Sequence, residues 1–588
     1  MPALPASTFD SVVLAAVAQE IARRLPLRVL RAGPGAAHEV LLHTEGGVLL
    51  FSADPSWARV HFTHRRPTLH QPHPFADLVR ARLVGGRIVG VRQPAFERLL
   101  ELEVETLDGV WHLVAEPMGK HANVVLVREG KVAGVARPVP PDRSRVRTLL
   151  PGLPYQPPPR DSRPAPGEWD PTALEACLCS REEPLWRGVL RCVAGIGPLL
   201  SYEMAWRTGD PEAACGPGHG AKLVPELAQL RDRLTRGLFD PRVYGPPAEP
   251  TFFTPFPYGC LATLESAQVN MSEAVERVLG ARARAAHLQA CRAALLQRIE
   301  TLLARKASAL EKVRRDLEQA HELDRLREWG ELLLAYAHQV PRGAPSARLP
   351  GYGGQPVEVP LDPARGAVEN AQDFFRRYAK LRATLQALPA RAQALEREVA
   401  TLQALRVHAE TASTAQELEA VQADLPPLPG RKRPQLGSPP ARTFTVDGFQ
   451  VVVGRSNRDN DRVTFRVASP QDLWFHARGL PGAHVVLKTG GRTPPEETVR
   501  RVAALAAYYS AGRQAGAVEV DVTERRHVHK PPGSPPGWVT YRGERTLRVP
   551  PHPPEGLETP PSPQGSPGED GGTPGPTLQE AQDEPPPG

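Results

Sequence analysis

The strongest hydrophobic pattern in the chain lies in its middle. Apolar residues recur there at alternating steps of about three and four, first from Leu295 to Ala320 and again from Leu381 to Leu402. Charged residues occupy the positions between them, which is typical of the seam of a coiled coil. We therefore predict two antiparallel coiled-coil arms over residues 273–424.

Three features interrupt this helical pattern. Lys306 lies in the first seam, and Pro389 should kink the second helix because proline removes a backbone donor. Residues 340–363 are rich in proline and glycine and should not be helical. We expect them to form a small cap within a distal middle segment of residues 321–370.

The first part of the chain has a mixed pattern. Residues 1–160 combine an opening helical pattern with short alternating runs, and Gly46 and Gly47 lie where a hairpin turn is expected. These features predict a mixed α/β domain. The prolines of residues 155–171 then indicate a linker.

Residues 172–270 have a helical pattern with one informative turn. The residues Gly195-Ile196-Gly197-Pro198 precede an apolar helix and resemble a helix-hairpin-helix motif. Free N–H groups at the start of such a helix can hold a phosphate. An ordinary helical hairpin explains the same residues equally well, so both interpretations stay open.

A compact α+β domain is expected over residues 441–552, after a proline-rich and basic linker of residues 425–440. A hairpin is predicted around Asp447-Gly448, and the segment 493–496 reads as a capping box that begins a helix. Taken with the N-terminal domain, the helical region and the coiled coil, this makes the chain a multidomain α+β protein.

The charge of the chain is unevenly distributed. Its formal net charge is +7, but residues 555–588 hold seven acidic side chains and no Lys or Arg. Without those seven negative charges the net charge is +14. Such a balance favours a polyanionic partner, although it also serves solubility. The acidic segment is rich in proline and glycine, so we predict a disordered tail.

Cysteine use and hydropathy indicate a cytoplasmic protein. The six cysteines lie between Cys177 and Cys291 and form no CxxC pair, which argues against a zinc ribbon or a secreted disulfide framework. The apolar run near the start is short and is broken by Asp10 and Glu20, so no signal peptide is predicted. Since no segment offers about 20 consecutive apolar residues, we expect no membrane contact.

The stretch DLWFHARGLPGAHVV, residues 472–486, gathers polar and aromatic rings around a glycine-proline loop. A zinc site needs three or four ligands, and His476, His484 and Asp472 are a weak set. No nucleophile elbow is present in the region. Two interpretations remain: histidines satisfied within a core, or a surface for RNA. The second is favoured by 17 Lys and Arg against 10 Asp and Glu over residues 441–550.

At this point the residues resemble a known family. Residues 448–486 are similar to the signature of the RNA-binding domain of the NFACT family, and residues 53–63, 115–127 and 361–382 resemble its other segments, with the same domain order over about 540 residues. The matching signature positions are Arg455, Asn457, Asn460, Asp461, Asp472, Trp474, Phe475, His476, Gly482 and His484.

The resemblance implies a ribosome quality control factor. Such proteins bind a large ribosomal subunit obstructed by peptidyl-tRNA and contact its rRNA. They recruit charged tRNA, alanyl-tRNA in bacteria, so that untemplated C-terminal tails mark the stalled peptide for proteolysis. The ribosome's own RNA makes the peptide bonds. The family resemblance therefore implies no catalytic residue, metal or cofactor, and we expect a monomer.

The resemblance also implies a tRNA-binding site in the N-terminal domain. The family's Asp-Arg pair corresponds to Glu97 and Arg98, so the carboxylate is one methylene longer here. A second motif matches nearby, with Pro117 in place of the usual aliphatic residue. The matching residues of this second motif are Glu116, Met118, Gly119, Lys120, His121 and Asn123.

Two other functional classes compete with this one. The N-terminal domain resembles that of formamidopyrimidine DNA glycosylases, which use an N-terminal proline as nucleophile. Pro2 is followed by Ala3 rather than by their catalytic glutamate, and their zinc finger is absent, so we interpret Pro2 as a coincidence. A surface adhesin that binds fibronectin, an older description of the family, would need an export signal.

Overall fold

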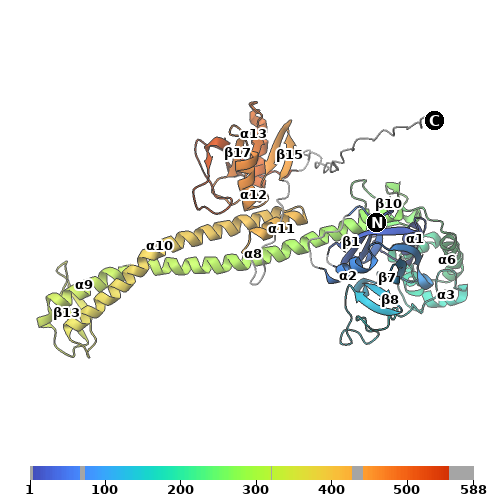
Figure 1. The fold of residues 1–588 in the computed structure, drawn as a ribbon, viewed down its shortest axis with the longest axis horizontal. Coiled ribbons are helices and arrows are strands. Elements are labelled where there is room, and N and C mark those ends of the chain that lie inside the picture. Colours follow the sequence, from blue (N-terminus) through green and yellow to red (C-terminus); the bar gives the residue numbers. More distant parts are fainter. Residues whose placement is uncertain (1–3, 37, 66–72, 319–320, 427–440, 555–588) are drawn as a thin grey trace, which may run out of the picture. The chain divides into compact units, whose positions relative to one another are not determined.

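The computed structural model describes residues 4–36, 38–65, 73–318, 321–426 and 441–554 (Figure 1). It divides into two compact units, Met1–His287 and Leu288–Gly588. Pro2, the tail of residues 555–588 and most of the linker of residues 425–440 lie outside the described residues, so the predictions made for them stay predictions.

The first unit is built on a nine-stranded antiparallel sheet, in the order β4-β3-β2-β1-β5-β6-β7-β8-β9. Helices α1 (Ser11–Ala22) and α2 (Pro74–Leu83) pack their apolar residues against it in one core. The hairpin expected at Gly46 and Gly47 is present, with Thr44 paired to Gly47. The strands are β1 (Leu27–Pro34), β2 (Glu39–Thr44), β3 (Gly47–Ser52), β4 (Arg59–Thr63), β5 (Arg87–Arg92), β6 (Leu100–Thr106), β7 (Gly109–Glu116), β8 (Asn123–Arg128) and β9 (Lys131–Val135).

The helical region of the first unit is shorter than the sequence pattern suggested. After its helices, residues 242–268 form a small antiparallel sheet in the order β11-β10-β12, so the prediction of helix throughout 172–270 was wrong there. Prolines such as Pro241 and Pro246 deny this stretch the backbone donors that a helix needs. The elements are α3 (Pro171–Leu178), α4 (Leu185–Cys192), α5 (Pro198–Thr208), α6 (His219–Arg236), β10 (Arg242–Tyr244), β11 (Phe252–Thr254) and β12 (Ser266–Gln268).

A disulfide joins Cys177 near the end of α3 to Cys192 at the end of α4. The spacing of the cysteines had not predicted this pair. Beyond the small sheet, α7 (Met271–Val275) continues through a single π-helical turn, Glu276–Gly280, into α8 (Ala281–Glu318).

The second unit contains the predicted antiparallel helical hairpin. Helix α8 lies beside α10 (Ala367–Thr411), which stays helical through Pro389 (Figure 1). Arg406 of α10 contacts Glu300 of α8 at 3.2 Å, and Arg314 of α8 contacts Glu396 of α10 at 3.0 Å. The two helices therefore run in opposite directions. Lys306, which interrupts the seam, forms an ion pair with Glu398 of α10.

The distal middle segment is a small cap with its own core. Helix α9 (His321–Ala335) and the hairpin of β13 (Ser346–Pro350) and β14 (Pro356–Pro360) pack around Leu333, Val359 and Phe374, the last of these on α10. The proline-rich stretch of residues 340–363 is therefore a hairpin with loops, as expected for a segment that cannot be helical.

The C-terminal domain of the second unit is a six-stranded antiparallel sheet in the order β15-β16-β18-β17-β19-β22. Helix α13 (Glu496–Tyr508) covers one face, and a smaller core around Trp474 covers the other. The remaining elements are α11 (Ala415–Asp424), α12 (Asn457–Arg462), a π-helical turn Val463–Val467, β15 (Arg442–Val446), β16 (Phe449–Val453), β17 (Leu473–Ala477), β18 (Val485–Lys488), β19 (Val518–Glu524), β20 (Val528–His529), β21 (Thr540–Tyr541) and β22 (Arg545–Val549).

Two local predictions in this domain had different outcomes. The hairpin at Asp447-Gly448 is confirmed, since Val446 pairs with Phe449 and both turn residues have positive φ, as a type I′ turn requires. The prediction of a capping box at residues 493–496 was wrong, because no side chain caps the start of this helix. Helix α13 begins only after Pro495, because a residue that precedes proline is disfavoured in the helical region.

Candidate RNA-binding sites

Glu97 and Arg98 lie on a tightly held turn between β5 and β6 of the first unit. Phe96 has φ +55, a left-handed conformation that costs energy for a bulky residue. Its ring fills the space beside Gly195, where an added Cβ would lie 2.4 Å from Cε1 of Phe96. Gln93 donates hydrogen bonds from Nε2 to the carbonyl oxygens of Ser11 at 3.0 Å and Glu97 at 2.9 Å. The turn is therefore fixed on both sides.

The two side chains of this pair are used differently. Oε1 of Glu97 accepts a hydrogen bond at 2.8 Å from the backbone N–H of Asp161, within the stretch predicted to be a linker. Arg98 is exposed and makes no hydrogen bond or ion pair with any described residue. The carboxylate is thus engaged inside the protein, and the guanidinium is available to a ligand.

The glycine turn at residues 195–198 is occupied from within. The carboxylate of Asp10 accepts hydrogen bonds from Gly197 N at 2.8 Å and from Val12 N and Val13 N at the start of α1, at 3.1 and 2.9 Å. Burial raises the pKa of Asp10 to about 6. Because a carboxylate already holds the N–H that would bind a phosphate, the structure favours an ordinary packed turn over a phosphate site.

The second N-terminal motif divides into buried and exposed residues. Glu116 is fully buried, forms a two-point ion pair with Arg147 and accepts a hydrogen bond from the Tyr155 hydroxyl at 2.8 Å. Asn123 is also buried, and its Oδ1 accepts from the N–H groups of Val124 and Arg137 at 3.0 Å each. Both residues hold the loop between β7 and β8 in place.

The loop itself carries the exposed side chains of this motif. Lys120 and His121 are exposed and Met118 is half-buried, around a 3-10 turn, Gly119–His121. Arg137 fastens the loop from below by donating to the carbonyl oxygens of Ala122 at 2.8 Å and Lys120 at 3.3 Å. Sequence reasoning missed Arg137, Arg147 and Tyr155, because nothing near them in the sequence marks them as partners of the motif.

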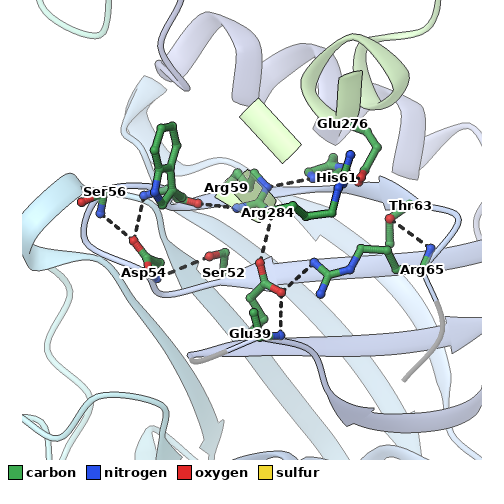
Figure 2. Close-up of polar contacts among 12 residues, drawn as sticks. Glu39, Ser52, Asp54, Ser56, Arg59, His61, Thr63, Arg65, Glu276 and Arg284 are labelled. Atoms are coloured by element: carbon green, nitrogen blue, oxygen red, sulfur yellow. Dashed lines mark hydrogen bonds and ion pairs between the residues drawn. The ribbon is translucent and has the colours of Figure 1, made fainter. Parts of the chain in front are cut away.

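Within residues 53–63, Arg59 and His61 belong to a buried ionic cluster with Glu39 and Glu276 (Figure 2). Arg59 is fully buried and donates to Glu39 at 3.0 Å, to the carbonyl oxygen of Trp57 at 2.7 Å and to Nε2 of His61 at 3.2 Å. Nδ1 of His61 lies 3.7 Å from Glu276, in the π-helical turn. Burial lowers the pKa of His61 to about 4, so the imidazole is neutral near pH 7. The cluster joins strand β4 of the sheet to the π-helical turn between α7 and α8.

In the C-terminal domain, the signature residues mostly fasten loops. Asp472 accepts from Ser469 N at 2.7 Å and from Thr489 N at 2.9 Å. Asn460 bridges to the glycine-proline loop, donating to the Gly482 carbonyl at 3.2 Å and accepting from His484 N at 3.0 Å. Such bonds to loop backbone explain why short polar side chains occur in this pattern.

Asp461, Arg455 and Asn457 make further fastening contacts. Asp461 accepts from Gly537 N at 3.1 Å and pairs with Lys530. Arg455 is mostly buried, with Nε 3.5 Å from Oε1 of Glu417 on α11. Nδ2 of Asn457 donates to the Thr401 carbonyl of α10 at 3.4 Å. Arg455 and Asn457 thus connect the domain to the helices that precede it.

The aromatic rings of the signature form one cluster. Trp474 is fully buried, with its ring stacked on His476 at 5.6 Å between centroids and edge-on to His484 at 5.1 Å. Nδ1 of His484 lies 2.8 Å from the hydroxyl of Thr464. Burial lowers the pKa of His476 to about 4 and that of His484 well below its usual range, so both rings are neutral. Trp474 and His484 are therefore core residues, whereas His476 is only partly buried and its imidazole makes no hydrogen bond with the described residues.

Nowhere in the described ranges do three or more His, Cys, Asp or Glu side chains gather in a way that could hold a metal ion. In the same part of the chain, no helix combines the length and apolar character needed to cross a membrane. Exposed cations lie near the signature, among them Arg458 and Arg478, whose side chains are 52% and 53% exposed. Arg458 pairs with Asp424 at 3.0 Å, and Arg478 lies 4.0 Å from Asp521.

Sequence comparison finds the same organisation in known proteins. Residues 10–427 match the family model described as NFACT N-terminal and middle domains, and residues 441–543 match the NFACT protein RNA binding domain. The chain is 30% identical over 525 residues to the Rqc2 homolog RqcH of Streptococcus suis, covering 86% of this chain and 90% of that protein. It is 26% identical over 548 residues to the Rqc2 homolog RqcH of Bacillus subtilis, covering 87% and 92%.

Solved structures cover parts of the chain. The C-terminal part of the fibronectin/fibrinogen-binding protein of Streptococcus suis matches with 32% identity and a TM-score of 0.31, over 44% of this chain and 96% of that one. The fibrinogen binding protein of Staphylococcus aureus matches with 17% identity and a TM-score of 0.38, over 46% and 98%.

Proposed function

The chain belongs to the NFACT family, and on that premise we propose that it acts in ribosome-associated quality control. It binds large ribosomal subunits obstructed by peptidyl-tRNA and recruits charged tRNA, with alanyl-tRNA as the proposed species. Untemplated C-terminal alanine tails then mark the stalled peptide for degradation. Similarity along most of its length to two Rqc2 homologs supports this role.

The observation that carries the tRNA-binding part is the exposed guanidinium of Arg98 on a fixed turn, whose charge also acts on the carboxyls of Asp10 and Asp161. A planar guanidinium offers paired donors that suit phosphate or the edge of a base. Glu97 and Phe96 hold the backbone of the turn. Arg98 therefore loses little backbone conformational entropy when a ligand binds. Lys120 and His121 add exposed polar groups from the second motif, while Glu116 and Asn123 position that loop.

In this role the protein positions its partners and performs no covalent step. Peptide bonds form at the ribosomal RNA, so a nucleophile or a metal in the protein is not needed. The C-terminal domain and the helical hairpin supply the surfaces that bind rRNA, with exposed cations such as Arg458 and Arg478 toward phosphates.

A double variant tests the assignment of the N-terminal site. Glu97→Ala with Arg98→Ala should abolish tailing and deplete co-purifying tRNA, because the guanidinium and the carboxylate that ties its turn to Asp161 are both removed. Binding to large subunits should persist. The measurement is gradient co-sedimentation beside a readout of C-terminal tails in one strain.

The matched control is Arg31→Ala, which removes an exposed arginine from β1 of the same sheet. It should leave both readouts unchanged. Full tailing by the double variant would reject the tRNA assignment, and loss of subunit binding together with tailing would indicate a docking or folding role instead.

A further inference from the structure

A cavity of ≈ 350 Å³ lies within the second unit, between α10 and the loops of the C-terminal domain. Its wall includes Asn457, His476 and the apolar residues Leu480, Pro481 and Val539, with Trp538 beside them. The volume falls in the range of small-molecule sites, about 300–1,000 Å³. The cavity is thus lined by residues of the signature, including Asn457 and His476, whose side chains keep hydrogen-bonding atoms that no described residue uses.

The lining of this cavity selects an uncharged group. None of the residues that line it is Asp, Glu, Lys or Arg, so nothing there pairs with a phosphate or an ammonium group. The imidazole of His476 makes no hydrogen bond with the described residues, and Oδ1 of Asn457 accepts none from them. A neutral imidazole both donates and accepts, and an amide oxygen accepts. Together they match the polar edge of a flat heterocycle.

Trp538 provides the stacking surface that such a ligand needs. It is 40% exposed, and it lies in the loop between β20 and β21. Aromatic rings of this kind stack unpaired bases in RNA-binding proteins. Outside the cavity, Arg478 lies two residues after His476 with its side chain 53% exposed. Its Nη1 contacts the Thr546 hydroxyl at 2.9 Å and lies 4.0 Å from Asp521, and the exposed part of the guanidinium can meet the backbone phosphate.

We propose that this cavity binds a single unstacked nucleobase of RNA, stacked on Trp538 and hydrogen-bonded at its edge by His476 and Asn457. The proposal rests on the proposed function and assigns the ligand class of its C-terminal domain. It gives the signature a direct part in binding. The fastening residues shape the pocket, and the pocket holds one base that the ribosomal or transfer RNA turns outward.

A mutant cycle with the full-length protein tests the pocket. Fluorescence anisotropy would follow ten-nucleotide single-stranded RNAs of adenosine, cytidine or uridine, beside a decamer with the same backbone and no bases. Trp538→Ala should weaken binding of the best base-containing decamer about tenfold or more and leave the abasic decamer nearly unchanged. Trp538→Phe should restore most of the affinity, because the phenyl ring can still stack.

Trp206→Ala is the matched control, since Trp206 is 46% exposed and belongs to the first unit. It should weaken the intact and abasic decamers equally or not at all. Equal loss for both decamers in Trp538→Ala would overturn the pocket. So would weaker binding to large subunits without any change on RNA, which would indicate a protein side chain as the occupant.

Co-sedimentation of the wild-type protein with large subunits tests the proposed ribosomal role separately from the nucleobase pocket. Absence of wild-type co-sedimentation would count against the ribosomal role. Co-sedimentation of the wild type, combined with no coupling between Trp538 and the base, would reject the nucleobase pocket alone.

Discussion

Three histidines of the second unit, His408, His476 and His484, are held neutral because burial lowers the pKa of each imidazole. His408 is the simplest to test, since it is 2% exposed and lies on α10 outside the cavity lining. After burial, the groups that act on it are Arg442 and His476, which lower its pKa further, and Glu417, which raises it. Its pKa falls to about 3, from the ordinary value of 6.5.

This shift predicts that acid destabilises the second unit. Below pH 6.5 the unfolded chain takes up a proton at His408 and the folded chain does not, so stability is complete above that pH and falls below it. Between pH 7 and pH 5 the loss from this residue is about 2 kcal/mol. His408→Gln should reduce the difference in unfolding free energy between the two pH values by about that amount, measured by urea denaturation. An unchanged difference would show that His408 is solvated.

Single residues also explain why the signature is hard to interpret from sequence. Asn460 and Asp472 carry groups that could meet RNA, yet they bond to backbone 17 to 24 residues away. Their sequence neighbours do not reveal those partners. Glu116 is similar, because Arg147 lies 31 residues further along the chain. Family resemblance located these residues, and only the fold separates those that shape a site from those that can touch a ligand.

At the level of elements, sequence patterns predicted the structures that depend on residues close together in the chain. The heptad spacing of α8 and α10 and the Asp447-Gly448 turn specify their structure within a few residues, and both were predicted. The sheet of residues 242–268 was missed because its three strands are only three residues each, too short to show an alternating pattern. The use of Gly197 by Asp10 depends on a contact across 187 residues.

The helical hairpin supports a prediction about binding to large subunits. The C-terminal domain contacts the end of α10, where Arg442 donates to the Thr411 carbonyl at 2.8 Å. The hydrophobic core around Ile299 of α8 and Leu405 of α10 lies near the same end of the helical hairpin. A variant that replaces residues 313–391 with a short glycine-serine loop keeps those contacts, whereas deletion of residues 285–410 would remove them.

The shortened variant should therefore keep a folded C-terminal domain and lose binding to large subunits, because the hairpin and its cap supply part of that surface. Circular dichroism and a melting curve check the fold, and co-sedimentation checks the binding. A variant in which only the loop Gly351–Gly354 becomes serine is the control for local changes in the cap. Full binding by the shortened variant would show that the hairpin does not contact the ribosome.

For the whole molecule, charge is the property that a polyanionic partner senses first. The net charge of +7 combines seven acids in residues 555–588 with a basic remainder of +14. The compact units differ in how they present cations: Arg98 projects from a fixed turn of the first, and Arg458 and Arg478 lie near the signature of the second. The long-range attraction to rRNA is the sum of these charges, reduced by the acidic segment.

This balance predicts that removing residues 555–588 strengthens binding to large subunits by about threefold or more at ~50 mM salt. The gain should shrink at ~300 mM salt. There the Debye length is less than about 10 Å, so the repulsion between the distant acidic side chains and the phosphates is screened. Filter binding at both salt concentrations measures it. A full-length variant with the seven acids changed to Asn and Gln is the control, and it should match the truncated protein. If truncation strengthens binding and the neutral variant does not, the segment acts by its bulk, and the charge explanation fails.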